Sequence, residues 1–252
     1  MQRSGTNMLM EVLERSLATQ VIHERDPRAF DHYLMRPPGV IAALRERSRA
    51  PVFVIKALCE LQRLHALMQQ FAPARTVWVV RHYEDVINSM LVSFPNQGRH
   101  FPAMVRGKRE DWRSEGMSSE TLAKLRKLYH AEMDAANTAA LIWYLRNILY
   151  FELGFEDIPS VLAVAYEDLV TEPQAAFERI FDFLDLDLRP WHTRWVVPNS
   201  IRRRQPPELE PGVRELCDSL MARFQGPLEH KPRSSAPSDD MNQPRTVNRP
   251  ES

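Results

Sequence analysis

The hydrophobic positions of this chain fall into short continuous runs, separated by longer stretches in which apolar residues recur every three or four positions. The continuous runs predict buried strands at Thr19–Ile22, Pro51–Ile55, Thr76–Val80 and Ser160–Ala165. The helical spacing predicts helices over Thr6–Leu17, Pro37–Arg47, Glu60–Phe71, Glu84–Leu91, Thr121–Leu153 and Phe177–Leu184. Strands of this kind, alternating with helices, indicate a parallel sheet covered on both faces. We therefore expect an α/β fold, a three-layer αβα arrangement that binds its ligand at the carboxyl ends of the strands.

The C-terminal stretch differs in composition from the rest of the chain. Residues 226–252 are rich in Pro, Ser, Asn and mixed charges and hold few apolar side chains. Such a segment buries too little surface to offset its ordering entropy, so we expect it to be a disordered tail. The remaining residues 1–225 have the size of a single domain.

Charge and composition narrow the functional classes. The chain has 252 residues with 33 basic and 33 acidic side chains, and this balance argues against a general nucleic-acid binder. It has no apolar run near the roughly 20 residues of a membrane span and no signal peptide at its start. Its two cysteines, Cys59 and Cys217, can form at most one bridge. We expect a cytoplasmic protein with neither a nucleic-acid partner nor a membrane span.

The first residues have the composition of an anion-binding turn. Gln2–Asn7 (QRSGTN) leads directly into the first predicted helix. Gly5 permits a tight turn, and Ser4, Thr6 and Asn7 offer side-chain donors. The helix N-terminus adds backbone N–H groups, and Arg3 adds a forked cation. An ordinary capped helix explains the same residue types.

A second candidate follows the strand Thr76–Val80. Arg81 stands at the carboxyl end of that strand, and Ser89 lies eight residues further on, in the next helix. Both can reach one anion if the strand-to-helix turn folds back, although an Arg after a strand is also a common surface cation. The nucleotide-binding motif GxxxxGK[ST] does not occur in the sequence.

Together these segments resemble the sulfotransferases that use 3'-phosphoadenylylsulfate (PAPS). QRSGTN is similar to their 5'-phosphosulfate loop, and VWVVRHYEDVINS is similar to their 3'-phosphate motif. VLAVAYEDLVTEPQAAFERIFDFLDL is similar to their later strand and Pro-headed helix. The resemblance implies a fold like that of P-loop NTPases and transfer of a sulfuryl group from PAPS to a hydroxyl or amine acceptor. The acceptor can be a small molecule, a carbohydrate or a peptide. No metal is implied.

The resemblance also assigns roles to single residues. The first loop, with Ser4, Gly5, Thr6 and Asn7, would hold the 5'-phosphate and sulfonate, and Arg3 would stabilise the bridging oxygen. Arg81 and Ser89 would hold the 3'-phosphate. A basic loop, Asn199–Arg204, would fold over that phosphate. The sequence does not choose among its arginines, of which Arg202 and Arg203 are the candidates.

The expected catalytic base depends on the branch of the family. Cytosolic small-molecule members carry a His shortly after the Lys that ends a strand, and no His follows Lys56 closely. The tyrosylprotein-type branch instead uses a Glu after the second strand. Glu24 fits that position, with His23 as the alternative. Lys56 would then be a sulfonate ligand.

One departure from the family pattern concerns the first strand. In the family a buried strand precedes the loop, whereas here the sequence begins at Met1. We expect either a start that lies upstream or a fold without its first strand. The second case favours a non-catalytic or truncated nucleotide-binding relative. A P-loop kinase or nucleotidase is a further alternative.

Overall fold

The structure is a computed structural model that describes residues 4–94, 96–107, 111–198 and 201–229. Its strands are β1 (Thr19–Ile22), β2 (Phe30–Asp31), β3 (Leu34–Met35), β4 (Val52–Ile55), β5 (Thr76–Val80) and β6 (Val161–Ala165). Its first helices are α1 (Thr6–Glu14), α2 (Pro38–Arg47), α3 (Leu64–Gln70), α4 (Tyr83–Ser93), α5 (Phe101–Arg106) and α6 (Ser119–Leu128). These are followed by α7 (Ala135–Glu152), α8 (Tyr166–Thr171), α9 (Pro173–Phe183), α10 (Pro190–Thr193) and α11 (Pro211–Glu229). Short 3₁₀ turns are η1 (Leu61–Arg63), η2 (Gln97–His100), η3 (Trp112–Ser114) and η4 (Phe155–Asp157).

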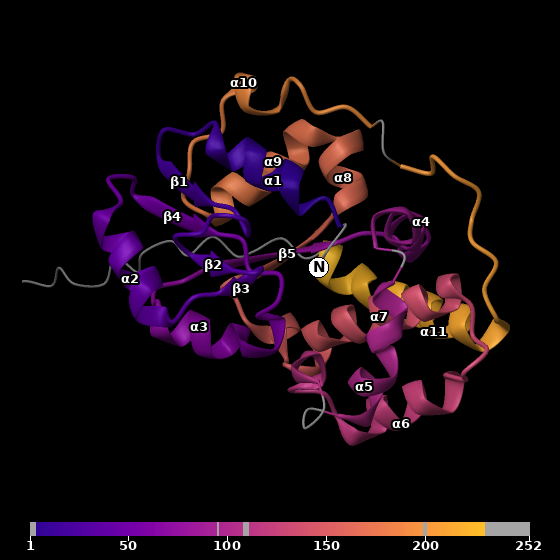
Figure 1. The fold of residues 1–252 in the computed structure, drawn as a ribbon. Helices are drawn as coiled ribbons and strands as arrows, with labels where there is room; N and C mark the ends of the chain where they lie inside the picture. The colour runs from indigo at the N-terminus through magenta and orange to yellow at the C-terminus, as the bar shows by residue number, and fades with distance from the viewer. Residues whose placement is uncertain (1–3, 95, 108–110, 199–200, 230–252) are drawn as a thin grey trace, which may run out of the picture.

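The strands β5 and β6 form a parallel pair between two layers of helices. Alternate residues of a strand point to opposite faces, and here the two faces join different apolar clusters. Trp78 and Val80 pack with residues of α4, α7 and α11, whereas Val77 and Val79 pack with residues of α1, α8 and α9. Figure 1 shows α1, α8 and α9 on one side of these strands and α7 and α11 on the other. This confirms an α/β fold with a parallel arrangement and helices on both faces.

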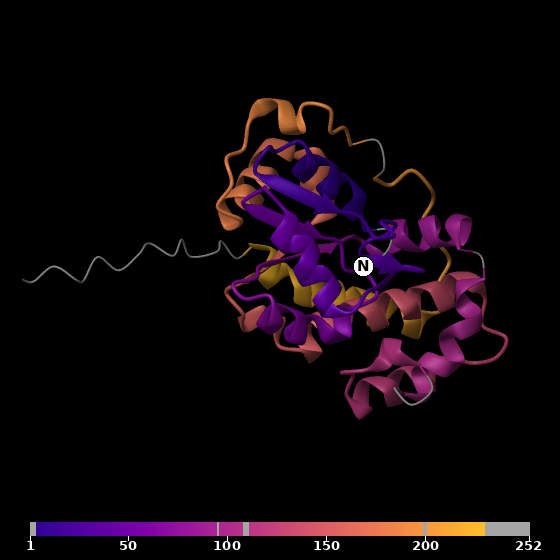
Figure 2. The same ribbon diagram turned by 60° about the vertical axis from the view of Figure 1, so that its left-hand side comes forward.

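The strands β1 and β4 form a second parallel pair, with Thr19 opposite Val52 and Ile22 opposite Ile55. One face of this pair shares the cluster under α1, and the other packs on Phe30 and Ile41. Figure 2 brings this side of the molecule forward. Across the described residues no hydrogen-bonded strand joins β4 to β5, so the expected central sheet is divided into two pairs.

Several predicted boundaries were wrong, and α1, for example, ends at Glu14 rather than at the exposed Leu17. The segment Thr121–Leu153 is two helices, α6 and α7, rather than one. The connecting residues His130, Ala131, Glu132 and Asp134 are exposed. The Asp134 side chain accepts a hydrogen bond from the Asn137 N–H and caps the new helix. The helix α11 continues to Glu229, beyond the expected start of a disordered tail. Leu228 packs on the core there, and its carbonyl accepts a hydrogen bond from Arg179 at 2.6 Å.

The β2–β3 hairpin was not predicted because its strands are only two residues long. Its turn places His32 and Tyr33 at positive φ, 46° and 67°, where glycine or asparagine is usual. The hairpin is tied down by the buried Glu60, whose Oε1 accepts a hydrogen bond from the Met35 N–H at 2.7 Å. No helix in the described part of the chain is long and apolar enough to cross a membrane.

Candidate functional site

The loop before α1 has the tight turn that its sequence predicted. Gly5 adopts φ +80° as the N-cap of the helix, a conformation that favours glycine. A Cβ at this position would lie 1.9 Å from a ring carbon of Tyr166, so only glycine lets the loop pass this close to the ring. Ser4 is fully buried, and its Oγ has no hydrogen-bond partner within the described structure. A buried hydroxyl without a partner beside a helix N-terminus is a ready donor for an anion.

A polar cluster joins this helix to the first strand pair. The Lys56 Nζ donates hydrogen bonds to the Asn7 Oδ1 and, at 2.8 Å, to the Glu24 Oε1. The Lys56 side chain is 5% exposed and the Glu24 side chain 13% exposed. Asn7 and Glu24, which are far apart in the sequence, thus both contact Lys56. All three are predicted site residues, and their roles stay predictions.

The strands explain why these side chains meet. Glu24 follows the end of β1, and Lys56 directly follows β4. The two strands are parallel and in register, and the Lys56 N–H continues the ladder by donating to the Ile22 carbonyl at 3.1 Å. Both side chains therefore leave the same carboxyl edge. His23, the alternative base, instead pairs with the exposed Glu14 at 3.5 Å.

A second cluster forms at the carboxyl edge of β5 and β6. The Arg81 guanidinium lies 4.5 Å from the centre of the Tyr166 ring and 3.5 Å from the Asp85 carboxylate. The Trp143 indole donates to the Arg81 carbonyl at 3.1 Å. Arg81 is therefore held in place by its backbone, a ring face and a carboxylate. Its ring contact is to the same Tyr166 that packs on Gly5, so one side chain links the loop to the predicted phosphate-binding Arg.

The remaining predicted nucleotide ligands lie along α4 and beyond it. Ser89 is partly buried, one helical turn after Asp85. The Asp85 carboxylate also accepts hydrogen bonds of 3.1 and 3.2 Å from the Arg202 N–H. This places Arg202 of the basic loop beside α4, with the Arg202 and Arg203 side chains exposed. Arg3 lies outside the described residues.

Sequence reasoning missed two residues that build the site. Tyr166 and Asp85 were not among the predicted site residues. Their signal was their position: Tyr166 begins the helix directly after β6, and Asp85 lies in the first turn of α4, the helix that follows β5. The acid next to Tyr166 supports the turn after β5, because the Glu167 Oε1 accepts a hydrogen bond from the His82 N–H at 3.0 Å.

Two further charged side chains, Arg146 and Glu60, are buried near the turn that follows Lys56. Arg146 donates to the Leu58 carbonyl at 3.1 Å, and its burial lowers its pKa to about 10. Burial raises the pKa of Glu60, which accepts hydrogen bonds from the Met35 and Cys59 N–H groups. These contacts fix the turn that follows Lys56. Among the residues that the structure covers, no group of His, Cys, Asp and Glu side chains has the arrangement of a metal site.

Comparison with known proteins identifies the class. The family model described as "Sulfotransferase family" matches residues 23–190, so the chain belongs to the sulfotransferase family. The matched range contains Glu24, Lys56 and Arg81, whereas Asn7 and the loop before α1 lie outside it.

Two individual proteins are similar to parts of the chain. "Cytosolic sulfotransferase 8" from Arabidopsis thaliana is 30% identical over 115 residues, which is 45% of this chain and 28% of that protein. The chain thus spans less than a third of the length of this relative. The solved structure of a "Sulfotransferase Domain from the Curacin Biosynthetic Pathway" overlaps with a TM-score of 0.43 at 15% identity. The overlap covers 73% of this chain and 67% of that one.

Proposed function

We propose that this protein binds PAPS and transfers its sulfuryl group to a hydroxyl or amine acceptor. The observation that carries the proposal is the position of four side chains. Glu24, Lys56, Arg81 and Tyr166 each follow the end of a parallel strand closely or directly. In α/β folds this edge is where ligands bind. The family membership supports sulfuryl transfer as the reaction.

The loop residues suit the 5' end of such a donor. The orphaned Ser4 Oγ and the backbone N–H groups at the start of α1 are donors for a phosphate or sulfonate. Gly5 allows this arrangement of donors at the start of α1, since any Cβ there would collide with Tyr166. Asn7 and Lys56, already in contact, complete a set of donors around one anion. Arg3 is the further cation that the resemblance assigns to this loop.

The α4 cluster suits the 3'-phosphate. The Arg81 guanidinium carries several N–H donors. One of its terminal nitrogens lies 3.5 Å from the Asp85 carboxylate. Ser89 adds a hydroxyl on the same side of α4, and the Arg202–Arg203 segment lies beside it through the Asp85 contact. The Arg81 guanidinium lies on the Tyr166 ring, and its backbone carbonyl is held by Trp143. A forked cation positioned in this way discriminates a 3'-phosphorylated nucleotide from one without that group.

Glu24 is the proposed general base. Sulfuryl transfer resembles phosphoryl transfer in its demand for positioning and charge stabilisation, and PAPS supplies an activated sulfuryl group with a nucleotide leaving group. The Glu24 carboxylate has one oxygen on Lys56 and can accept the acceptor's proton on the other. Lys56 then neutralises negative charge at the same place. His23 stays the alternative, although its contact is with Glu14.

A non-catalytic nucleotide-binding relative is the second candidate. It is favoured by the Glu24–Lys56 contact itself, because a nearly buried ion pair can serve structure alone. The test is release of 3',5'-adenosine bisphosphate from PAPS in the presence of phenol, sugar, peptide and fatty-alcohol acceptors, with mass spectrometry of each acceptor. Transfer to any acceptor, lost in Glu24→Gln, supports the enzyme. Nucleotide binding without transfer supports the second candidate, and binding of ATP in preference to the bisphosphate supports a kinase or nucleotidase.

A further inference from the structure

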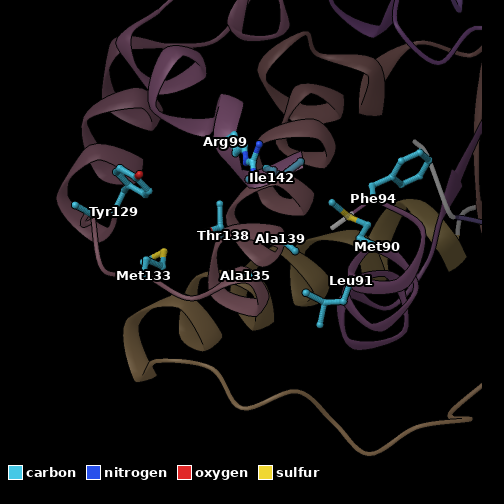
Figure 3. A pocket seen from close by; sticks show the side chains of 12 residues that line it. Met90, Leu91, Phe94, Arg99, Tyr129, Met133, Ala135, Thr138, Ala139 and Ile142 are labelled. Atoms are coloured by element: carbon cyan, nitrogen blue, oxygen red, sulfur yellow. The ribbon is translucent and has the colours of Figure 1, made fainter. Parts of the chain in front are cut away.

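A pocket with a volume of about 300 Å³ lies in the helical part of the molecule, apart from the strand edge. It is formed by the end of α4, the turn η2, the connection between α6 and α7, and the first turns of α7. Figure 3 shows the side chains of Met90 and Phe94 on one side of it and those of Tyr129 and Met133 on the other. By the ~30 Å³ that one water occupies in the liquid, it has room for roughly ten non-hydrogen atoms.

The side chains that line the pocket are mostly apolar, and one of them is charged. Aliphatic, thioether and aromatic side chains make up most of the wall, and Arg99 is its one charged member. Among the described residues that line it there is no acidic side chain. Arg99 is exposed, and the structure gives its guanidinium no carboxylate partner among the described residues. Figure 3 shows the Arg99 side chain among those that line the pocket. An apolar wall beside one cation suits a ligand with an apolar body and one negative group.

The carboxylates closest in sequence are engaged elsewhere. Asp134 caps α7 by accepting from the Asn137 N–H at 2.7 Å and from the Asn137 side chain at 3.0 Å. Glu132 pairs with His130 at 3.6 Å. The N-terminus of α7 also points its partial positive charge toward this end of the helix. Arg99 and the helix N-terminus are therefore the two features of the pocket that favour an anionic group.

The pocket is separate from the proposed nucleotide site. Arg81, Asp85 and Ser89 follow one another at four-residue spacing, so Asp85 and Ser89 share one face of α4. At about 100° per residue, Met90, Leu91 and Phe94 lie about 100–200° around the helix from Ser89. The helix thus stands between the two sites.

We propose that this pocket is a second binding site, for a small amphipathic monoanion such as an aryl or alkyl carboxylate. The apolar body fills the space between Met90 and Met133, and the anionic group pairs with Arg99. The proposal does not depend on the nature of the reaction at the strand edge. Since that edge and the pocket lie on different faces of α4, both are occupied at once.

The test compares 4-phenylbutyrate with its neutral analogue 4-phenylbutan-1-ol by ligand-detected NMR titration of the full chain. The acid should bind about threefold to fivefold more tightly, the range expected for one exposed charge. Arg99→Gln should remove that preference, while Lys124→Gln, which removes an exposed cation outside the pocket, should keep it. Ala135→Trp fills the pocket from an exposed position and should abolish binding of both compounds.

Saturating 3',5'-adenosine bisphosphate should leave the affinity for 4-phenylbutyrate unchanged. Circular dichroism and thermal melting of each variant verify that it is folded. Equal binding of acid and alcohol, a preference that survives Arg99→Gln, binding that survives Ala135→Trp, or displacement by the nucleotide would each overturn the proposal.

Discussion

The two parallel strand pairs carry the same kind of edge but are supported very differently. The β5–β6 pair lies between two extensive clusters of buried side chains, and Trp78, Val79 and Val80 are almost fully buried. In the β1–β4 pair only Ile22 is buried to that degree, and the small cluster on its outer face has four buried members. The candidate 3'-phosphate ligands therefore follow the more extensively packed β5–β6 pair, and the candidate base follows the less extensively packed β1–β4 pair.

The difference shows where the molecule relies on packing and where it relies on polar contacts. Arg81 is fixed by a ring face and by the indole N–H of a core residue. Glu24 and Lys56 are fixed largely by each other and by Asn7, with Glu60 holding the neighbouring hairpin. Under the proposed function, the nucleotide binds beside the more extensively packed pair and the acceptor beside the other one.

The largest effect is expected from a substitution at the end of the β1–β4 pair. Glu24→Gln keeps the size of the side chain but removes its ability to take a proton, so kcat should fall by about 10²–10⁴-fold. The KM for PAPS should stay within about twofold, because Glu24 is not among the nucleotide ligands. Steady-state kinetics on any acceptor that is turned over provides the measurement. Glu14→Gln, which removes the partner of His23, is the control; an unchanged kcat in Glu24→Gln would assign the base elsewhere.

The difference in support is tested by a matched pair of core substitutions. Ile180 is fully buried in the cluster under β5 and β6, and Ile41 is 2% exposed in the small cluster beside β1. Ile→Ala costs about 2–5 kcal/mol in the free energy of unfolding. Ile180→Ala should lie near the upper end of that range and Ile41→Ala near the lower end, as measured by urea denaturation. An equal or reversed order would remove the contrast between the two pairs.

A smaller effect is expected at the loop that both pairs flank. Gly5→Ala introduces a Cβ at φ +80° and 1.9 Å from the Tyr166 ring, so Gly5 and Tyr166 must both shift. A displacement of the loop donors by about 1 Å weakens their contacts strongly. We therefore expect at least a tenfold loss of affinity for 3',5'-adenosine bisphosphate. Gly39→Ala, at a helical glycine with nothing within 4 Å, should bind normally. Normal binding by Gly5→Ala would exclude the loop from the nucleotide site.

The smallest effect concerns pH and lies in the helical part. A hydrogen bond of 2.9 Å to the Glu210 carboxylate raises the pKa of His130. Because the folded-state pKa is above the unfolded value of about 6.5, this contact stabilises the fold fully below that pH. Its contribution is lost as the pH rises through the folded-state pKa. Melting temperatures between pH 5.5 and 8.5 should show a slight decline that His130→Gln removes; a decline that persists in the variant would point to another group.

The elements that the sequence predicted well are those that follow from local pattern. Thr76–Val80 and Thr19–Ile22 are strands with the predicted bounds because continuous apolar runs have few alternatives in a covered sheet. Thr121–Leu153 was wrongly read as one helix because the apolar spacing continues across Tyr129–Asp134, where capping ends and restarts the helix. Residue identities suggested Glu24, Lys56 and Arg81, but not that Asn7 touches Lys56 or that Tyr166 joins Gly5 to Arg81. Those contacts depend on tertiary packing, which no local pattern contains.

The central claim is that the carboxyl edge of β5, with α4, holds a 3'-phosphorylated nucleotide. Calorimetric titration of 3',5'-adenosine bisphosphate tests it most directly, in the parent chain, in Arg81→Ala and in Arg47→Ala, whose exposed cation lies on α2. We predict binding by the parent and by Arg47→Ala, and at least about a 30-fold loss in Arg81→Ala, since truncation removes a charged, well-held donor. Equal binding by Arg81→Ala, with circular dichroism showing an intact fold, would contradict the account.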